Sequence, residues 1–320
     1  MKVLANDGLA QSGVTALEAA GFEVILTTVA QEQLESFINE EGIDVILVRS
    51  ATTVRQELID ACPSIKIIGR GGVGMDNIDV QYARDNGLHV INTPAASSHS
   101  VAELVFAHFS GLARFLQDSN RNMPLEGESN FKGLKKAYAG GVELKGRTLG
   151  VLGFGRIGQA TAAVALRLGM NVVAYDPFME SATISLDFIN GQKIDFTIDT
   201  ISKEDVLKQA DFLTLHVPAQ EQYVIGAKEI ESMKDGAFIA NAARGGVIDE
   251  DALIANLDSG KVAHAALDVF TNEPTPREDL LKHTKISLTP HTGAATGEAQ
   301  DRIGEEVAQQ IINHFNSVTA

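Results

Sequence analysis

The chain has 320 residues, 44% of them hydrophobic, which predicts two domains with a core each and excludes a disordered or fibrous protein. The formal net charge of −16 disfavours a surface that binds nucleic acid or an anionic membrane. The single cysteine, Cys62, cannot form an intramolecular disulfide, and no signal peptide or membrane-spanning run is visible, so we expect a cytoplasmic protein in which this thiol is structural.

Strands and helices alternate along the first part of the chain. Short runs rich in β-branched residues predict strands, and the helical patterns between them stop at Gly21 and Gly42. Such alternation favours a parallel sheet with helices on both faces. The predicted strands cover residues 2–5, 24–27, 45–49, 65–69 and 89–92, with helices at 14–20 and 31–40.

A long helical stretch over residues 98–116 leaves this first unit, and a second alternating series follows. A last helix is predicted at about 297–315, where apolar residues recur at i, i+4 spacing. We therefore expect two doubly wound units that bind ligands at the carboxyl ends of their strands. The strands of the second series are predicted at 148–153, 172–176, 212–216, 237–242, 264–270 and 286–288.

The stretch from Gly153 to Gly158, Gly-Phe-Gly-Arg-Ile-Gly, lies between a predicted strand and a predicted helix. Such a turn lets the backbone approach a pyrophosphate, and the helix N-terminus offers free N–H groups and a partial positive charge. Asp176 ends the next strand, where a carboxylate would accept hydrogen bonds from a ribose diol and repel a 2′-phosphate. Because Pro177 and Phe178 supply no cation, NAD is predicted rather than NADP. The alternative is an ordinary tight turn.

Arg244, Glu273 and His291 lie downstream of this turn, and two of them directly follow predicted strands. An arginine at the carboxyl end of a strand can grip a carboxylate in bidentate geometry. A carboxylate beside an imidazole favours the charged ring and fixes its tautomer, which suits a proton acceptor in alcohol oxidation. Each residue alone is compatible with a surface charge or a packed side chain. Together they predict hydride transfer to or from a 2-hydroxy acid.

With these motifs the chain resembles the D-2-hydroxyacid dehydrogenase family, at residues 151–158, 241–250, 266–274 and 290–299. The resemblance implies an α/β protein with two doubly wound parallel sheets. A Rossmann NAD-binding domain, 98–290, would be inserted into a flavodoxin-like substrate-binding domain made of 1–97 and 291–320. It also implies a homodimer formed through the nucleotide-binding domain.

The family implies roles for single positions. Arg244 would bind the substrate carboxylate and carbonyl, Glu273 would pair with the histidine, and His291 would be the acid/base. The pyrophosphate would meet Arg156 and Ile157, and the nicotinamide carboxamide would meet Ala242 and Asp268. The implied cofactor-binding residues are Gly153, Gly155, Arg156, Ile157, Gly158, Asp176, Ala242, Ala243, Asp268, Gly293 and Ala294.

Within the family, residues 49–52, 69–77 and 291–300 resemble the phosphoglycerate dehydrogenase branch. The implied reaction oxidises 3-phospho-D-glycerate to 3-phosphohydroxypyruvate, the entry to L-serine synthesis. Arg49 and Arg70, predicted at strand ends, could clamp the phosphate, unless both are solvated surface charges. Lys135 and Lys136 are further candidates for phosphate contacts. The implied substrate-binding residues are Arg49, Ser50, Arg70, Val73, Gly74 and Arg244.

Two alternatives stay open: a related enzyme that reduces glyoxylate or hydroxypyruvate, and a non-enzymatic NAD(H)-sensing protein that acts as a corepressor. The chain stops at Ala320, where longer relatives continue into a serine-binding regulatory domain. Feedback by serine through such a domain is therefore not expected.

The link from Asp176 to Asp211 looks longer than the family norm. Over residues 183–198, apolar and polar residues alternate on both sides of Asn190-Gly191, which is the strongest short signal for a β-hairpin. We predict a hairpin there, next to the adenosine end of the cofactor.

Overall fold

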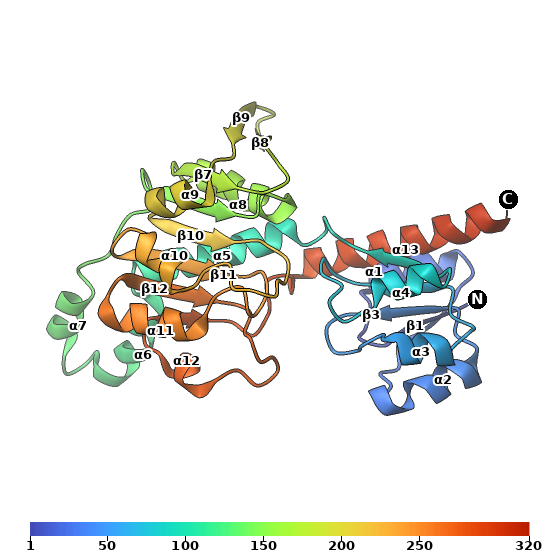
Figure 1. Ribbon diagram of the computed structural model, residues 1–320. Helices are drawn as coiled ribbons and strands as arrows, with labels where there is room; N and C mark the ends of the chain where they lie inside the picture. The colour runs from blue at the N-terminus through green and yellow to red at the C-terminus, as the bar shows by residue number, and fades with distance from the viewer. Residues whose placement is uncertain (320) are drawn as a thin grey trace. The chain divides into compact units, whose positions relative to one another are not determined.

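The computed structural model describes residues 1–319, which form two compact units (Figure 1). The terminal unit consists of Met1–Ser98 and the segment from Ala294 onward, and the central unit is His99–Gly293. The sequence-based boundaries were 97/98 and 290/291. The second one would assign His291 to the terminal unit, whereas the structure keeps it in the central unit.

The terminal unit is built on a five-stranded parallel sheet in the order β2-β1-β3-β4-β5, the flavodoxin-like order. Its central strand β3 reads Val-Ile-Leu-Val and is buried throughout, as expected for a strand covered on both faces. The elements are β1 Lys2–Ala5, α1 Gln11–Ala19, β2 Glu23–Ile25, η1 Gln31–Gln33, α2 Leu34–Glu41, β3 Val45–Val48, α3 Gln56–Ala61, β4 Ile67–Arg70, α4 Val80–Asp85, β5 His89–Asn92 and α13 Gly297–Thr319.

The last helix, α13, returns to this sheet. Its buried residues Val307, Ile311 and Phe315 join a core cluster with strand β1 and helix α1, as the apolar stripe predicts. Helices α1 and α13 approach closely, because a Cβ on Gly13 would lie 2.7 Å from Gly304 O. The two glycines therefore allow the helix that ends the chain to pack on the unit that begins it.

The central unit contains a six-stranded parallel sheet in the order β13-β12-β11-β10-β6-β7. This is the Rossmann order, except that a single parallel bridge between Ala174 and Thr200 stands in place of the strand beyond β7. The elements are α5 Ser98–Ala113, α6 Leu116–Glu126, α7 Phe131–Ala137, β6 Thr148–Leu152, α8 Arg156–Arg167, β7 Asn171–Tyr175, β8 Ser181–Asp187, β9 Lys193–Asp199, α9 Lys203–Gln209, β10 Phe212–Leu215, α10 Ala227–Ser232, β11 Ala237–Asn241, α11 Glu250–Ser259, β12 Val262–Leu267, α12 Glu278–Lys282 and β13 Ile286–Leu288.

The helix predicted over residues 98–116 ends earlier than the sequence suggests. Helix α5 stops at Ala113, and Phe115 has a φ of 56°, a left-handed conformation that a continuous helix cannot contain. The chain then forms α6 and α7, which project from the sheet of the central unit (Figure 1). No residue of α6 is buried.

The hairpin predicted between residues 183 and 198 is confirmed. Strands β8 and β9 pair antiparallel, with Ile184 opposite Phe196. Gly191, at a φ of 83°, closes the connecting loop, and its N–H bonds to Phe188 O. Alternate residues of β8, Ile184 and Leu186, enter the core beside α8, and their chain neighbours Thr183, Ser185 and Asp187 are exposed. The two-residue periodicity thus reports a hairpin with one buried face.

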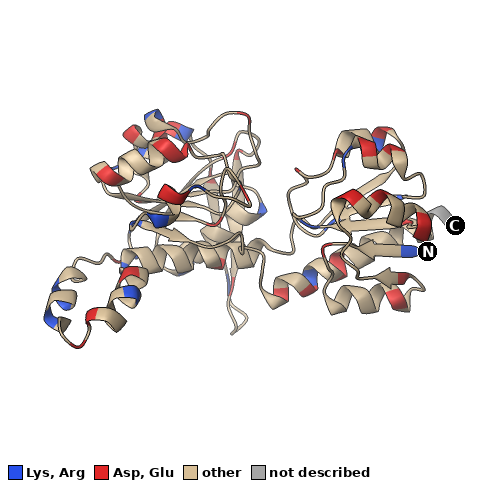
Figure 2. Ribbon diagram, turned by 90° about the horizontal axis from the view of Figure 1, so that it is seen from below, with Lys and Arg blue, Asp and Glu red and all other residues tan. Residues whose placement is uncertain are grey.

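Cys62 is buried, and burial raises the pKa of its thiol to about 11. It is therefore a protonated, structural side chain at neutral pH. In Figure 2, ribbon segments coloured for Lys and Arg are interspersed with segments coloured for Asp and Glu along the helices of both units. Within residues 1–319, no helix is long and apolar enough to cross a bilayer.

Candidate active site

The glycine-rich turn joins β6 to α8, and close packing requires two of its glycines. Gly153 has a φ of 89°, and a Cβ there would lie 2.4 Å from His216 O. A Cβ on Gly158 would lie 2.2 Å from Gly153 O, so α8 could not approach the turn with a larger residue at that position. Gly155 is the N-cap residue of α8 and has open space beside it. The helix N-terminus can therefore receive a pyrophosphate.

Asp176 directly follows β7 and is tied to this turn. Its Oδ2 accepts a hydrogen bond of 2.8 Å from Phe154 N, and its Oδ1 accepts one of 2.9 Å from Phe178 N. Each carboxylate oxygen has a further lone pair, which can accept a ribose hydroxyl. The turn and the carboxylate together fit the pyrophosphate and adenosine ribose of NAD.

His216 lies directly beneath the turn, and the sequence analysis did not single it out. Its Nε2 is 3.0 Å from Thr214 Oγ1 and 3.1 Å from Thr161 Oγ1, so the ring bridges the end of β10 and helix α8. Its Nδ1 is buried without a partner among residues 1–319. Desolvation lowers the pKa of His216 to about 3. The imidazole is therefore a neutral packing element of the cofactor turn.

Arg244 emerges from a turn just after β11. Asn241 holds this turn, because its Nδ2 donates to Arg244 O at 2.8 Å and its Oδ1 accepts from Ala243 N at 3.0 Å. The next residue must be glycine, since a Cβ on Gly245 would lie 1.8 Å from Phe270 O. The guanidinium donates to Ala243 O at 2.7 Å. Ala242, Ala243 and Arg244 thus lie together in one hydrogen-bonded turn directly after β11.

Glu273 and His291 are brought together by the fold. His291 Nδ1 lies 2.8 Å from Glu273 Oε2, and the other carboxylate oxygen accepts from Phe270 N at 2.9 Å. Both side chains are partly exposed. His291 has a φ of 54°, a conformation that costs about 1–2 kcal/mol for a residue with a Cβ. Such strain persists only where the surroundings hold it in place.

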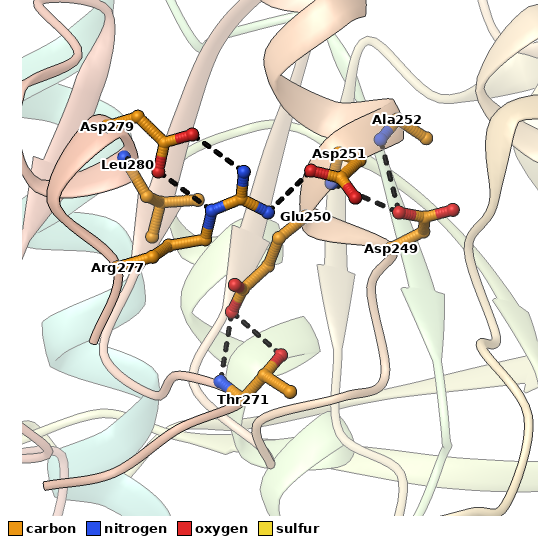
Figure 3. Close-up of polar contacts among 8 residues, drawn as sticks. All are labelled: Asp249, Glu250, Asp251, Ala252, Thr271, Arg277, Asp279 and Leu280. Carbon is orange, nitrogen blue, oxygen red and sulfur yellow. Dashed lines mark hydrogen bonds and ion pairs between the residues drawn. The ribbon is translucent and has the colours of Figure 1, made fainter. Parts of the chain in front are cut away.

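The loop that carries Glu273 is fastened to the start of helix α11 (Figure 3). The guanidinium of Arg277 donates to both carboxylate oxygens of Asp279, at 2.7 and 2.6 Å, and to Asp251 at 2.6 Å. Glu250 Oε1 accepts from the backbone N and the hydroxyl of Thr271, both at 2.9 Å. Contacts on both sides of Glu273 therefore fix the loop, although only Glu273 itself has a chemical role in the sequence analysis.

Asp268, expected near the nicotinamide carboxamide, is 1% exposed and organises the turn around His291. Its Oδ1 accepts from Thr289 Oγ1 at 2.6 Å and from Thr292 N at 2.7 Å. Its Oδ2 accepts from Gly293 N at 2.8 Å. A Cβ on Gly293 would lie 3.0 Å from that same oxygen. The neighbouring Ala294 belongs to the terminal unit and accepts from Gln300 Nε2 at 2.7 Å.

The residues expected to bind substrate occupy neighbouring strand ends of the terminal unit. Arg49 directly follows β3, and Arg70 ends the adjacent strand β4. The Arg70 guanidinium donates to Arg49 O at 3.2 Å and to Gly74 O, so it also shapes the loop that contains Val73 and Gly74. The structure thus gives Arg70 a part in building this loop, in addition to the phosphate contact expected of it.

Asp7 and Asn77 support the same loops, and the sequence predicted this role for neither of them. Asp7 Oδ2 accepts from Arg49 N at 2.6 Å and from Thr52 N at 3.1 Å. Asn77 Nδ2 donates to Arg49 O at 2.8 Å and to Thr52 O at 2.6 Å. The position of Asp7, just past the first predicted strand, was the sequence feature that could have indicated its role. The segment that contains Arg49 and Ser50 is therefore clamped from both sides.

Comparison with known families decides the class of protein. Residues 106–293 match the model of the D-isomer specific 2-hydroxyacid dehydrogenase NAD binding domain. A hydroxypyruvate reductase of Thermotoga maritima is 42% identical over 298 residues, which cover 92% of this chain and 91% of that protein. The chain belongs to the D-2-hydroxyacid dehydrogenase family. It is an NAD-dependent oxidoreductase, as the glycine turn and Asp176 predict.

Other relatives of this dehydrogenase are longer. A D-3-phosphoglycerate dehydrogenase of Methanocaldococcus jannaschii is 41% identical over 318 residues, which cover 97% of this chain but 57% of that protein. The chain thus spans little more than half the length of that relative.

Solved structures agree on the fold. The TT0316 protein of Thermus thermophilus superimposes with a TM-score of 0.83 at 28% identity, covering 99% of this chain and 97% of that one. A Staphylococcus aureus NAD-dependent formate dehydrogenase in complex with NAD gives 0.80 at 26% identity, covering 99% and 96%.

Proposed function

We propose that this dehydrogenase oxidises 3-phospho-D-glycerate to 3-phosphohydroxypyruvate, the first step of L-serine synthesis, with His291 as the acid/base. The observation that carries the chemistry is the 2.8 Å contact between His291 Nδ1 and Glu273. Because Nδ1 is engaged, Nε2 is the nitrogen that faces substrate. It takes the hydroxyl proton during oxidation and returns it during reduction, and the Glu273 carboxylate stabilises the imidazolium that forms.

The remaining catalytic part is Arg244, whose guanidinium binds the substrate carboxylate and polarises the forming carbonyl. NAD, when bound, supplies the acceptor for the hydride that leaves C2. The pyrophosphate of NAD is held by the residues of the glycine-rich turn, Gly153, Gly155, Arg156, Ile157 and Gly158. Asp176 holds its adenosine ribose, and Ala242, Ala243, Asp268, Gly293 and Ala294 bind near the nicotinamide.

The substrate assignment is supported by the two arginines of the terminal unit. Arg49 and Arg70 stand at the carboxyl ends of adjacent parallel strands, where doubly wound sheets bind ligands. Two guanidinium groups there suit a dianionic phosphate, in a chain whose net charge of −16 repels anions elsewhere. Ser50, Val73 and Gly74 lie in the adjoining loops and complete the proposed substrate site. Similarity to the M. jannaschii phosphoglycerate dehydrogenase over 97% of the chain points the same way.

Reduction of hydroxypyruvate is the second candidate, because the T. maritima relative with that name is 42% identical and similar in length. The two functions differ by one phosphate. The assay is therefore NADH formation at alkaline pH, with a trap for the keto product. It compares 3-phospho-D-glycerate with D-glycerate, D-lactate and 2-hydroxyglutarate, and hydroxypyruvate with its 3-phosphate in the reverse direction. Equal kcat/KM for D-glycerate and its phosphate would refute the substrate assignment and leave the family intact.

Arg49 offers the sharper genetic test, because replacing Arg70 would also disturb the Gly74 loop. Arg49→Gln should raise KM for the phosphorylated acid about 10- to 100-fold, the value of a charge-assisted hydrogen bond, and leave KM for NAD unchanged. Arg84→Gln, which makes the same charge change at an exposed site on α4, is the matched control. An unchanged KM in Arg49→Gln contradicts the phosphate clamp. Absence of turnover with every acid, in a protein that binds NADH, would favour the sensor alternative.

We further propose that the protein is a homodimer formed through its central unit. Helices α6 and α7 project from this unit and expose Leu125 at 79% and Phe131 at 57%. Exposed apolar side chains on projecting helices are typical of subunit contacts. Lys135 and Lys136 follow on α7, where they would approach the partner's substrate. Light scattering of the purified protein tests the dimer directly.

A further inference from the structure

We propose that His108, a buried histidine on α5, is a positioning residue that holds the turn presenting His291, acting through Thr289 and Asp268. This inference rests on the role proposed for His291. His108 itself does not contact substrate in the proposed mechanism, and the sequence gives no functional signal for this side chain.

A directed chain of hydrogen bonds begins at the edge of the central sheet. Gln117 Nε2 donates to Ser287 Oγ. Ser287 Oγ is 2.5 Å from His108 Nδ1, and His108 Nε2 is 3.1 Å from Thr289 Oγ1. The Thr289 hydroxyl donates to Asp268 at 2.6 Å. That hydroxyl has one hydrogen, so it must accept from His108. His108 is therefore protonated on Nε2, and Ser287 donates to its Nδ1.

The hydrogen-bond chain ends at the carboxylate of Asp268, which binds residues on both sides of His291 in the sequence. Asp268 accepts from the side chain of Thr289, two residues before His291, and from the backbone N–H groups of Thr292 and Gly293, which follow it. His291 has a φ of 54°, which is unfavourable for any residue with a Cβ. The bonds to Asp268 hold the backbone in this conformation. His108 holds the Thr289 side chain in the position from which it donates to Asp268.

Three side chains of this network are buried, whereas Gln117 and Thr289 are partly buried. His108, Asp268 and Ser287 are 5%, 1% and 3% exposed. Burial lowers the pKa of His108, so its ring is neutral near pH 7 and has a single N–H, which Thr289 accepts. Removal of the imidazole leaves the Thr289 hydroxyl without its hydrogen-bond donor, so the Thr289 side chain is held less firmly and can turn away from Asp268.

Loss of this support should appear in turnover rather than in substrate affinity. The hydroxy acid is bound by arginines that the chain does not touch, whereas proton transfer depends on where the His291 ring lies. His108→Leu should therefore lower kcat about 2- to 10-fold, the factor for one hydrogen bond, and leave KM for the hydroxy acid within about twofold.

The experiment is a double-mutant cycle of His108→Leu and Thr289→Val, run with whichever D-2-hydroxy acid the wild type oxidises best. If His108 acts through Thr289, the double variant should be no slower than the slower single variant. His108→Gln, whose amide can donate to Thr289, should restore most of kcat. His264→Leu is the control: it removes a half-buried imidazole of the central unit, one that stacks on Phe238 and lies outside this chain. It should lower thermal stability and leave kcat unchanged.

A second measurement is independent of turnover. Amide hydrogen exchange of Thr292 and Gly293 should be faster in His108→Leu than in the wild type, and close to wild type in His108→Gln and His264→Leu. Unchanged exchange at both amides overturns the inference. So does a double variant whose loss in kcat is the product of the losses in the two single variants. If exchange is faster in His108→Leu but the wild type prefers another D-2-hydroxy acid, His108 remains a positioning residue and 3-phospho-D-glycerate is rejected as the substrate.

Discussion

The buried His216 makes the stability of the central unit depend on pH. Its pKa is about 3 in the folded protein against 6.5 for the free side chain. A histidine with a lowered folded pKa stabilises the fold fully above pH 6.5, and this stability is lost as the pH falls towards 3, because the unfolded chain gains a proton that the folded chain refuses. His216→Gln removes the titrating group and retains a polar side chain between Thr161 and Thr214.

The magnitude follows from the two pKa values. At pH 5 the unfolded histidine is protonated and the folded one is not. The difference of about 1.5 pH units below 6.5 corresponds to a loss of about 2 kcal/mol from the free energy of unfolding. At pH 7 this loss is close to zero. For a unit of this size, about 2 kcal/mol moves Tm by about 4–8 °C.

The assay is denaturant unfolding of wild type and His216→Gln at pH 7 and pH 5. The variant should be less stable at pH 7, because it loses packing, but its stability should fall by about 2 kcal/mol less between the two pH values. Carboxylates and the other histidines with lowered pKa values, His108 and His264, contribute equally to both proteins and cancel. His99→Gln removes an exposed imidazole and is the matched control. Equal pH dependence in wild type and His216→Gln would refute the argument that desolvation keeps this ring neutral.

Two further substitutions follow from the site geometry. Glu273→Gln removes the carboxylate that stabilises the His291 imidazolium, so kcat should fall about 10-fold or more. The affinity for NADH should be unchanged. An unaltered kcat would remove Glu273 from the mechanism. Gly245→Ala places a Cβ 1.8 Å from Phe270 O, so it should cost more than about 2 kcal/mol in unfolding measurements. Gly297→Ala, with open space and an ordinary φ, should change stability by less than about 0.5 kcal/mol, and similar losses in the two would contradict the steric argument.

Local patterns in the sequence determined the fold class and the chemistry of this protein. The glycine turn and Asp176 are close in the chain and share a recurrent backbone geometry, so their spacing alone predicts a nucleotide site. Alternating polarity on both sides of Asn190-Gly191 likewise predicts the β8–β9 hairpin, because the side-chain period of a strand is two. The end of α5 was not predictable in this way, since nothing in the composition around Phe115 announces a left-handed residue.

The support of the active site was decided only by the tertiary structure. His108 and Thr289 are 181 residues apart in the chain, and each alone looks like an ordinary residue of a helix or a strand end. Neither has a local signal, because a buried hydrogen-bond network depends on which elements the fold places side by side. The sequence therefore named Arg244, Glu273 and His291 from their chemistry. Packing of α5 against the end of β13 supplied the side chains that hold His291 in its strained turn.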